Sequence, residues 1–264
     1  MPKKNILIAL SFFLITGVSW SQNTPIPDNN FEQALIDLGY DSAPLNNFIP
    51  TANLVNITNL NVDNKNISDL SGIQDFNNLT VLSCANNNLT AIDITNNIKL
   101  KQLFCSFNKI KNIDVSQNIE LFILWCESNE ITNIDVSNNI ELISLISSNN
   151  PIENLDVTNN LRLNVLGCEN NLLTNLDITR NTDLSSLTCD YNQLTTLNIS
   201  NNTKLTNITC SNNFVTSLNI SLNTNLLNLN ASRNKLTELD VTNNFSLKGL
   251  LFENNVIDNI DITN

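Results

Sequence analysis

The chain has 264 residues, of which 25 are acidic and 13 are basic, so its formal net charge is −12 at pH 7, and it contains no histidine. This excess of acid argues against binding to nucleic acids or anionic membranes, which attract positively charged proteins. The lack of histidine removes His-based catalytic triads and the commonest zinc sites.

Residues 1–21 have the pattern of a secretory signal peptide. Two lysines precede an apolar run over residues 6–18, and the small residues Ser19 and Ser21 flank a cleavage point before Gln22. The apolar run is too short to span a membrane. No cysteine follows the cleavage point to carry a lipid anchor. We therefore expect a secreted or cell-surface protein without a membrane span.

Residues 22–56 are expected to form a short helical cap at the N-terminus. Asp28 is a suitable N-cap residue, and Gly39 is suited to end the helix. Three apolar residues at i, i+4 and i+7 share one helix face: Phe31, Leu35 and Leu38. Because an open solenoid end exposes apolar core, we expect Tyr40 and Phe48 to help cover the first repeat.

A repeat fills residues 57–264. Its first copy is a variant of 22 residues with these apolar residues: Ile57, Leu60, Val62, Ile67, Leu70, Ile73 and Phe76. Nine copies of 21 residues then follow without an insertion, and each begins with a leucine: Leu79, Leu100, Leu121, Leu142, Leu163, Leu184, Leu205, Leu226 and Leu247. Numbered from that leucine, position 4 is Leu or Ile, and positions 11, 14 and 16 are always Leu, Ile or Val.

Within each copy, inward positions 4 and 6 alternate with variable positions 3, 5 and 7, which is the period of a β-strand. One copy cannot bury its apolar face alone, so neighbouring copies must stack. Ten stacked copies give a parallel sheet roughly 45–50 Å long, with strands ~4.8 Å apart. We predict a mostly β solenoid of about ten turns.

The pattern LxxLxCxxNxLxxLDVSxNxx resembles the leucine-rich repeat, whose signature is L-x-x-L-x-L-x-x-N/C-x-L. The segment ISDLSGIQDF at residues 67–76 looks like an internalin-type repeat. Residues 26–62 resemble the start of leucine-rich-repeat proteins that Bacteroidota export. The resemblance implies one solenoid turn per copy and a concave β-face that recognises a protein, peptide or carbohydrate.

Two asparagine columns run through the copies. Position 9 is Asn in nine copies, from Asn87 to Asn255, and position 19 is Asn in eight, from Asn97 to Asn244. Backbone groups at the corners of a solenoid lack a ladder partner, and buried polar groups need one. Since an amide side chain has both a donor and an acceptor, we expect position 9 to bridge adjacent copies and position 19 to do the same at the return corner.

The six cysteines all occupy position 6: Cys84, Cys105, Cys126, Cys168, Cys189 and Cys210. An even number in an exported chain is compatible with disulfides. However, the cysteines form two runs of three adjacent copies, so pairing within a run would leave one thiol free. In addition, the Cβ atoms of stacked residues are parallel and ~4.8 Å apart, which exceeds the roughly 3.5–4.5 Å between Cβ atoms in disulfides. We expect six free thiols that fill the core as small apolar groups. Without a CxxC pair or histidine, neither a metal site nor a cofactor is expected.

The variable outward positions carry the candidate binding site. Apolar residues gather at positions 3 and 5 of the early copies: Phe104, Ile123, Trp125 and Ile146. Carboxylates follow at position 7: Glu127, Glu169 and Asp190. An aromatic anchor with a polar rim is typical of interface hot spots. We interpret these seven residues as a docking surface for a protein, peptide or glycan with complementary basic groups. The alternative is that the apolar residues occur on a β-face by chance.

A further column, position 15, contains mostly aspartate: Asp93, Asp114, Asp135, Asp156, Asp177, Asp240 and Asp261. A calcium ion would relieve repulsion between the stacked carboxylates. Alternatively, each carboxylate faces solvent and caps nearby backbone amides, beside the Ser or Thr of position 17. The glycine-rich calcium-binding repeat is missing, which favours capping.

No enzymatic activity is predicted. Glu127 with Glu169 or Asp190 has the residue types of a glycosidase pair. These residues would stand on an open sheet without the closed pocket that catalysis needs.

The sequence ends at Asn264, inside a copy, and leaves a row of apolar residues without a neighbouring repeat: Leu250, Phe252, Ile257, Ile260 and Ile262. Either the bulky Phe245 and Phe252 cover this end, or the sequence is a fragment of a longer protein, which we favour. Related proteins often carry further repeats and a type IX secretion sorting domain. The alternative function is therefore a structural spacer or adhesin segment of a longer surface protein.

Overall fold

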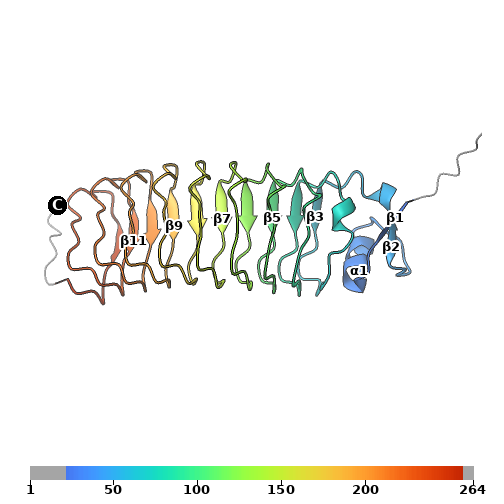
Figure 1. Cartoon of the computed structure of the whole chain (residues 1–264), viewed down its shortest axis with the longest axis horizontal. Coiled ribbons are helices and arrows are strands. Elements are labelled where there is room, and N and C mark those ends of the chain that lie inside the picture. Colours follow the sequence, from blue (N-terminus) through green and yellow to red (C-terminus); the bar gives the residue numbers. More distant parts are fainter. Residues whose placement is uncertain (1–21, 258–264) are drawn as a thin grey trace, which may run out of the picture.

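The computed structural model describes residues 22–257, so the expected signal peptide lies outside the described residues. The chain forms an elongated solenoid with one parallel sheet along its side (Figure 1). The sheet contains ten three-residue strands in chain order: β3 (Asn59–Asn61), β4 (Val81–Ser83), β5 (Gln102–Phe104), β6 (Ile123–Trp125), β7 (Ser144–Ile146), β8 (Val165–Gly167), β9 (Ser186–Thr188), β10 (Asn207–Thr209), β11 (Asn228–Asn230) and β12 (Gly249–Leu251). The predicted mostly β solenoid is confirmed.

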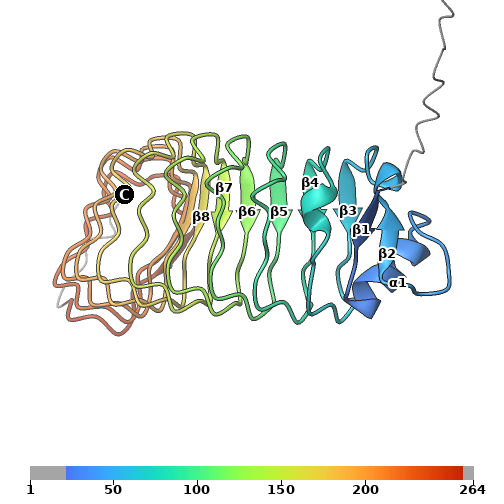
Figure 2. The same ribbon diagram turned by 45° about the vertical axis from the view of Figure 1, so that its right-hand side comes forward.

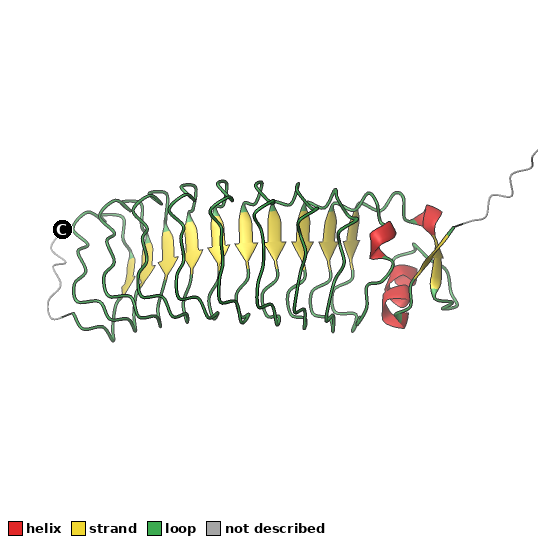
Figure 3. Ribbon diagram, viewed as in Figure 1, coloured by secondary structure: helices red, strands yellow, loops and turns green. Residues whose placement is uncertain are grey.

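The strands occupy positions 3–5 of each repeat, and long loops return the chain between them (Figure 3). Leu82 pairs with Leu103 at the regular spacing, whereas Leu60 pairs with Leu82 across 22 residues, as expected of the variant first copy. Position 4 is fully or almost fully buried from β3 to β11. All seven apolar residues predicted for the first copy are also buried.

The N-terminal cap packs against one end of the solenoid (Figure 2). It contains helix α1 (Asn29–Asp37), an antiparallel pair of strands, β1 (Asn23–Pro25) and β2 (Phe48–Pro50), and the 3₁₀ turn η1 (Thr51–Asn53). Asp28 caps α1 by accepting from two backbone N–H groups, both at 2.9 Å. Gly39 ends α1 with a φ of 77°, and the N–H of Tyr40 donates to the carbonyl of Leu35 at 2.9 Å, as in a Schellman motif.

Two predicted cap contacts are wrong. Leu38 is exposed because α1 ends at Asp37, so Leu38 is the C-cap and leaves the buried face. Phe48 is exposed because it takes an outward position in β2, and the inward position belongs to Ile49. The cap instead joins the first repeat through Phe31, whose ring stacks on Phe76 at 6.4 Å, beside the 3₁₀ turn η2 (Ile73–Asp75).

Asparagine at position 9 bridges neighbouring repeats as predicted. The side-chain amide of Asn150, for example, donates to the carbonyl of Cys126 in the previous repeat at 3.1 Å. It also donates to the carbonyls of Ser147 and Ser148, and its oxygen accepts from the N–H of Ile131 at 3.0 Å. Both the donor and the acceptor are therefore used.

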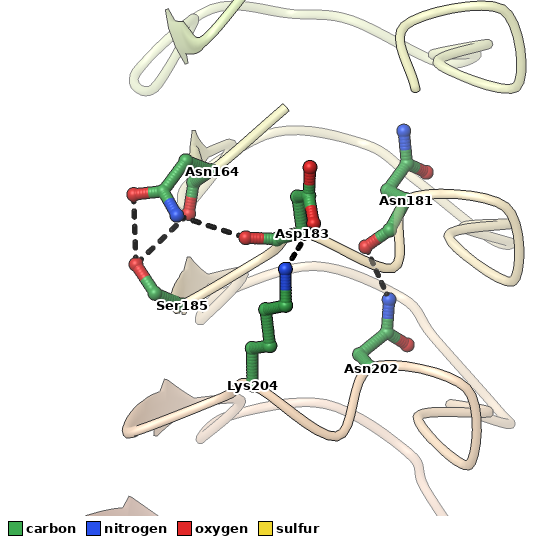
Figure 4. A network of polar contacts seen from close by, with 6 residues as sticks. All are labelled: Asn164, Asn181, Asp183, Ser185, Asn202 and Lys204. Carbon is green, nitrogen blue, oxygen red and sulfur yellow. Dashed lines mark hydrogen bonds and ion pairs between the residues drawn. The ribbon is translucent and has the colours of Figure 1, made fainter. Parts of the chain in front are cut away.

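Asparagine at position 19 donates hydrogen bonds to the previous repeat as predicted, but it does not accept any through its side chain. The amide of Asn202 donates to the carbonyls of Ile178 and Asn181 at 2.9 and 2.8 Å, and the second bond is visible in Figure 4. The side-chain oxygen of Asn202 is buried without a hydrogen-bond partner, as in the other seven asparagines of this column. At this corner the neighbouring backbone presents carbonyls to the side chain, so the expected acceptor role is wrong.

The six cysteines lie in the core as free, buried thiols, as predicted. Burial raises the pKa of every one of them. For Cys210, burial and the nearby Asp190 carboxylate raise the pKa to about 12. These thiols therefore act as small apolar side chains.

The aspartate column caps its own loops and faces solvent. In Asp156 and Asp177, Oδ1 accepts from the backbone N–H and the hydroxyl of the threonine two residues on, at 2.7–3.0 Å. Asn198 and Asn219 make the same contacts where the column lacks Asp. The capping interpretation is confirmed.

At the last described repeat, Phe245 is 78% exposed, so it does not cover the end of the core. Leu250 and Phe252 are half-buried and pack against the core from one side. The predicted edge residues Ile260 and Ile262 lie outside the described residues. No helix within residues 22–257 has the length and apolarity needed to cross a lipid bilayer.

Candidate binding surface

Positions 3, 5 and 7 of the repeats form the outward face of the sheet, called the sheet face below. Side chains alternate along a strand, so the inward leucine at position 4 directs both of its neighbours outward. Phe104 ends β5, Ile123 and Trp125 flank the inward residue of β6, and Ile146 ends β7. Phe104 pairs with Trp125, and Trp125 pairs with Ile146. The structure therefore brings the four predicted apolar residues together, and we call them the apolar patch.

Trp125 is at the centre of the apolar patch and is 40% exposed. Its ring meets the ring of Phe104 edge to face, with centroids 5.1 Å apart and an interplanar angle of 83°. Its Nε1 donates to Oγ of Ser144 on β7 at 3.0 Å. One ring contact and one hydrogen bond thus hold the indole in place while its surface remains open to solvent.

The apolar patch ends at Gly167 on β8. A Cβ atom on Gly167 would lie 2.9 Å from Cδ1 of Ile146, which shows that the Ile146 side chain leans into the space above the glycine. Beyond this point, the same strand position holds Thr188, Thr209 and Asn230. At this strand position the sheet face is therefore apolar from β5 to β7 and polar from β9 to β11, before Leu251 in β12.

The carboxylates at position 7 mostly accept hydrogen bonds from residues of the next repeat. Oε2 of Glu169 accepts from the hydroxyl of Thr188 at 2.6 Å. Asp190 accepts from the hydroxyls of Thr209 and Ser211 and, at 2.7 Å, from the N–H of Ser211. These two residues lie beyond the apolar patch, and their oxygens tie adjacent repeats together.

Glu127 is the predicted carboxylate that adjoins the apolar patch, because it follows Trp125 by two residues on the same side of the chain. Its Oε2 is buried without a hydrogen-bond partner. Of the seven predicted binding residues, the structure thus gathers five and places Glu169 and Asp190 further along the sheet. A docking role for all seven remains a prediction.

The prediction missed two apolar residues that stand directly before the strands. Phe122 and Ile143 occupy position 2 and help to line an open pocket together with charged residues: Lys101, Glu120, Glu141 and Arg162. Lys101 pairs with Glu120 at 3.4 Å, and Arg162 pairs with Glu141. The signal in the sequence is that position 2 is apolar in these adjacent copies and polar in the next three.

The prediction also missed an exposed aliphatic ridge at position 20. It consists of residues from four consecutive repeats: Ile98, Ile119, Ile140 and Leu161. The next three residues of this column are threonines. The ridge spans the repeats of β4 to β7 and so overlaps the repeats that carry the apolar patch.

The polar half has a different surface chemistry. Beside β8 and β9, Asn164 and Ser185 form a hydrogen bond of 2.9 Å between their side chains, and Lys204 pairs with Asp183 (Figure 4). A larger pocket lies over the capping loops and is lined partly by Asn219 and Asp240, whose side chains accept from Ser221 and Thr242. Within residues 22–257, no three His, Cys, Asp or Glu side chains are grouped to hold a metal ion.

Comparison with known proteins identifies the fold. No protein-family model matches the sequence, and the search of curated proteins found no match. The functional domain of InlJ from Listeria monocytogenes, which includes a cysteine ladder, is 30% identical with a TM-score of 0.72. That match covers 92% of this chain and 64% of the InlJ chain, so this chain spans slightly less than two thirds of it.

Two further structures have the same architecture. An internalin, InlF, from L. monocytogenes strain 4b F2365 is 26% identical with a TM-score of 0.84, over 92% of this chain and 75% of that one. The leucine-rich-repeat ectodomain of the Arabidopsis thaliana receptor kinase GASSHO1/SCHENGEN3, in complex with CASPARIAN STRIP INTEGRITY FACTOR 2, is 23% identical with a TM-score of 0.67, over 71% of this chain and 26% of that one. The predicted leucine-rich-repeat fold is thereby confirmed.

Proposed function

We propose that this leucine-rich-repeat solenoid is a secreted or cell-surface binding module that takes a protein or peptide partner on its sheet face. The observation that carries the proposal is the apolar patch around Trp125. A tryptophan that is 40% exposed, with its ring orientation fixed by Phe104 and Ser144, presents a rigid apolar surface to solvent. Aromatic anchors of this kind supply much of the binding energy in protein interfaces.

The distribution of apolar residues supports recognition over chance exposure. Position 5 holds Phe, Trp and Ile in the repeats of β5 to β7, and position 20 holds Ile or Leu in the repeats of β4 to β7. In the repeats of β9 and β10, positions 2, 3, 5 and 20 hold only Ser, Thr and Asn. Single exposed apolar residues are common on proteins, but a contiguous cluster on one half of a regular array marks a contact surface.

Export is the second part of the proposal. The lysines, apolar run and small residues of the N-terminal segment are the support for a signal peptide at residues 1–21. One of the two similar Listeria structures is described as an internalin, and the plant receptor ectodomain was solved in complex with a named factor. A partner that binds to an exported leucine-rich repeat is consistent with these relatives.

The alternative is a structural spacer or adhesin segment within a longer surface protein. The polar, regular sheet face from β9 to β11 favours this alternative for the later repeats, because such a surface offers no anchor. A spacer does not need the apolar patch. The two functions therefore differ in whether the apolar patch matters.

A capture experiment with residues 22–264 separates the two functions. The immobilised protein is incubated with extracellular proteins and with a glycan array, and captured partners are identified. The Phe104→Ala/Trp125→Ala variant is expected to lose the captured partner. The matched control, Ser186→Ala/Asn228→Ala, changes outward residues of the polar half and is expected to keep it.

Retention of the same partner by the Phe104→Ala/Trp125→Ala variant would contradict the proposal, provided that circular dichroism shows both variants to be folded. Capture of glycans in place of a protein or peptide would reassign the ligand class while keeping the surface. Equal loss in both variants would show that the contact is spread over the solenoid, as expected of a spacer or adhesin.

A further inference from the structure

The acids at position 7 that are followed by another described repeat obey one rule with one exception. At position 7, each of three acids accepts a hydroxyl hydrogen bond from position 5 of the next repeat: Asp63 from Ser83, Glu169 from Thr188, and Asp190 from Thr209. Asp63 and Asp190 also accept from the backbone N–H of position 7 in the next repeat, both at 2.7 Å. The solenoid thus supplies these acids with donors of its own.

Glu127 is the exception. The next repeat places Ile146 where the other acids meet Ser or Thr, so that position has no hydroxyl to donate. Oε2 of Glu127 is buried without a partner. A buried carboxylate oxygen without a donor is unfavourable, because the group has lost water without gaining a hydrogen bond.

A second unpartnered group lies in the same column, one repeat further on. Ser148 is only 2% exposed, and its Oγ has no hydrogen-bond partner. This Oγ lies 3.3 Å from the point where a Cβ on Gly167 would stand, and a Cβ at that strand position projects from the sheet face. The hydroxyl therefore lies close to the Ile146 side chain, beside Gly167.

The sheet face contains no cation that could satisfy Glu127. Positions 3, 5 and 7 of all nine regular copies hold no lysine or arginine. The lysines and arginines that form ion pairs within the described repeats stand at other positions and have partners of their own: Lys101, Lys111, Arg162 and Lys204. None of these cations pairs with Glu127, so its carboxylate keeps an unpartnered oxygen beside the apolar patch.

We propose that the partner bound by the apolar patch places a lysine or arginine side chain against the Glu127 carboxylate, with the Ser148 hydroxyl as a second polar contact. This inference rests on the proposed binding function and specifies its partner: a segment with a basic residue flanked by apolar residues. Charge-assisted hydrogen bonds of this kind are stronger than neutral ones, and exclusion of water by the partner strengthens them further. The acidic net charge of the chain steers a basic partner towards it.

A side-chain cation fits this site better than a metal ion. Metal ions such as Ca²⁺ take six to eight oxygen ligands, whereas the described residues around Glu127 offer no group of three acidic, cysteine or histidine side chains. One carboxylate and one hydroxyl match the few donors of an ammonium or guanidinium group. The adjoining Trp125 and Ile146 match the apolar stem of such a side chain.

A displayed library of random peptides tests the inference. Peptides are selected on residues 22–264, and those that lose binding to the Trp125→Ala variant are kept. We expect the kept peptides to contain Lys or Arg next to apolar residues. Replacement of that basic residue by glutamine should weaken binding to the native chain by about tenfold or more, and should have little effect on binding to Glu127→Gln.

Two matched pairs of variants isolate the carboxylate. Ile146→Thr introduces the hydroxyl donor that the other acids have in the next repeat. Ile146→Val introduces a side chain of nearly the same shape as threonine that cannot donate a hydrogen bond. Ile146→Thr should therefore weaken the basic peptides more than Ile146→Val does, although neither changes the charge. Asp63→Asn changes a position-7 acid outside the predicted docking surface that already has partners, and should leave binding unchanged.

The outcomes distinguish this inference from the proposed function. Peptides that depend on Trp125 but lack a basic residue, or that bind equally to the native chain and Glu127→Gln, would overturn the inference and leave the binding surface in place. If no selected peptide depends on Trp125, both the inference and the proposed surface are wrong.

Discussion

The side-chain amide of Asn150 donates to the carbonyl of Cys126 one repeat earlier, at 3.1 Å, and so joins two successive repeats through a single residue. Asn160, in the other asparagine column, donates to Val136 and Asn139 but leaves its oxygen without a partner. The two columns look equivalent in the sequence. The structure shows that they use different numbers of hydrogen bonds.

The first prediction compares these two asparagines. Asn150→Ala removes three donated bonds and one accepted bond, whereas Asn160→Ala removes two donated bonds. We expect roughly 3 kcal/mol of destabilisation for Asn150→Ala and roughly 1–2 kcal/mol for Asn160→Ala. Urea unfolding of both variants measures the difference. A larger loss for Asn160→Ala would contradict the hydrogen-bond assignment.

The second prediction concerns Phe107, which adopts a left-handed backbone with φ of 56° and has a side chain that is 52% exposed. Asparagine is the usual residue at this position, as at Asn149 and Asn170, because it tolerates the left-handed conformation better than other side chains do. Phe107→Asn should stabilise the chain by about 1 kcal/mol. The reverse change, Asn170→Phe, is the control and should lower the urea midpoint.

The fold was predictable because every repeat poses the same packing problem. A leucine or isoleucine at position 4 and, in all but the last copy, a small residue at position 6 repeat at a constant spacing, and only stacking buries them together. The cap was less predictable, since it occurs once: Leu38 fits the helical period, but the helix ends one residue earlier. Where no second copy exists, a local end signal overrides the periodic pattern.

The candidate site was predictable in position but not in hydrogen bonding. Strand alternation places Trp125 and Phe104 outside, and the structure agrees. Whether an acid has a partner depends on the residue one repeat further along, such as Thr188 for Glu169 and Ile146 for Glu127. Such pairs are separated by 19 residues and become apparent only once the register is known.

The third prediction concerns the thiols. Because burial raises the pKa of each cysteine, the native chain should not react with a thiol reagent at pH 8. In denaturant without reductant, six thiols should react per chain, matching the six free cysteines. A titration that finds fewer than six would show that disulfides have formed within the column. Cys84→Ser is the control and should lower the count by one.

The fourth prediction concerns acid stability. Hydrogen bonds from Ser116, first the side-chain contact and then the backbone N–H, hold the pKa of Asp114 below its usual value, and Thr179 does the same for Asp177. A group whose pKa is lower in the folded state stabilises the fold above its unfolded pKa. That stabilisation is lost as the pH falls through the folded pKa. The urea midpoint should therefore fall between about pH 5 and about pH 2.

Asp114→Asn provides the control for this acid effect. Asn198 accepts from Ser200 in the same way as the aspartates do, so asparagine retains the capping bond but does not titrate. The variant should lose less stability on acidification than the native chain does. An identical pH profile for the two proteins would mean that Asp114 does not contribute to acid sensitivity.

The fifth prediction uses Trp125 as a reporter of its own environment. The chain has two tryptophans, and cleavage after the predicted signal peptide removes Trp20, so the fluorescence of residues 22–264 comes from Trp125. Because Trp125 is 40% exposed, iodide should quench its emission in the free protein. A partner that covers the apolar patch should reduce this quenching and shift the emission to shorter wavelength, since it removes water from the indole.

The Ser144→Ala variant frees the indole N–H and should change the emission of the free protein without preventing the protection by the partner. If a captured partner binds tightly while iodide quenching stays the same, the contact lies elsewhere on the solenoid, and the exposed ridge of position 20 becomes the surface to test.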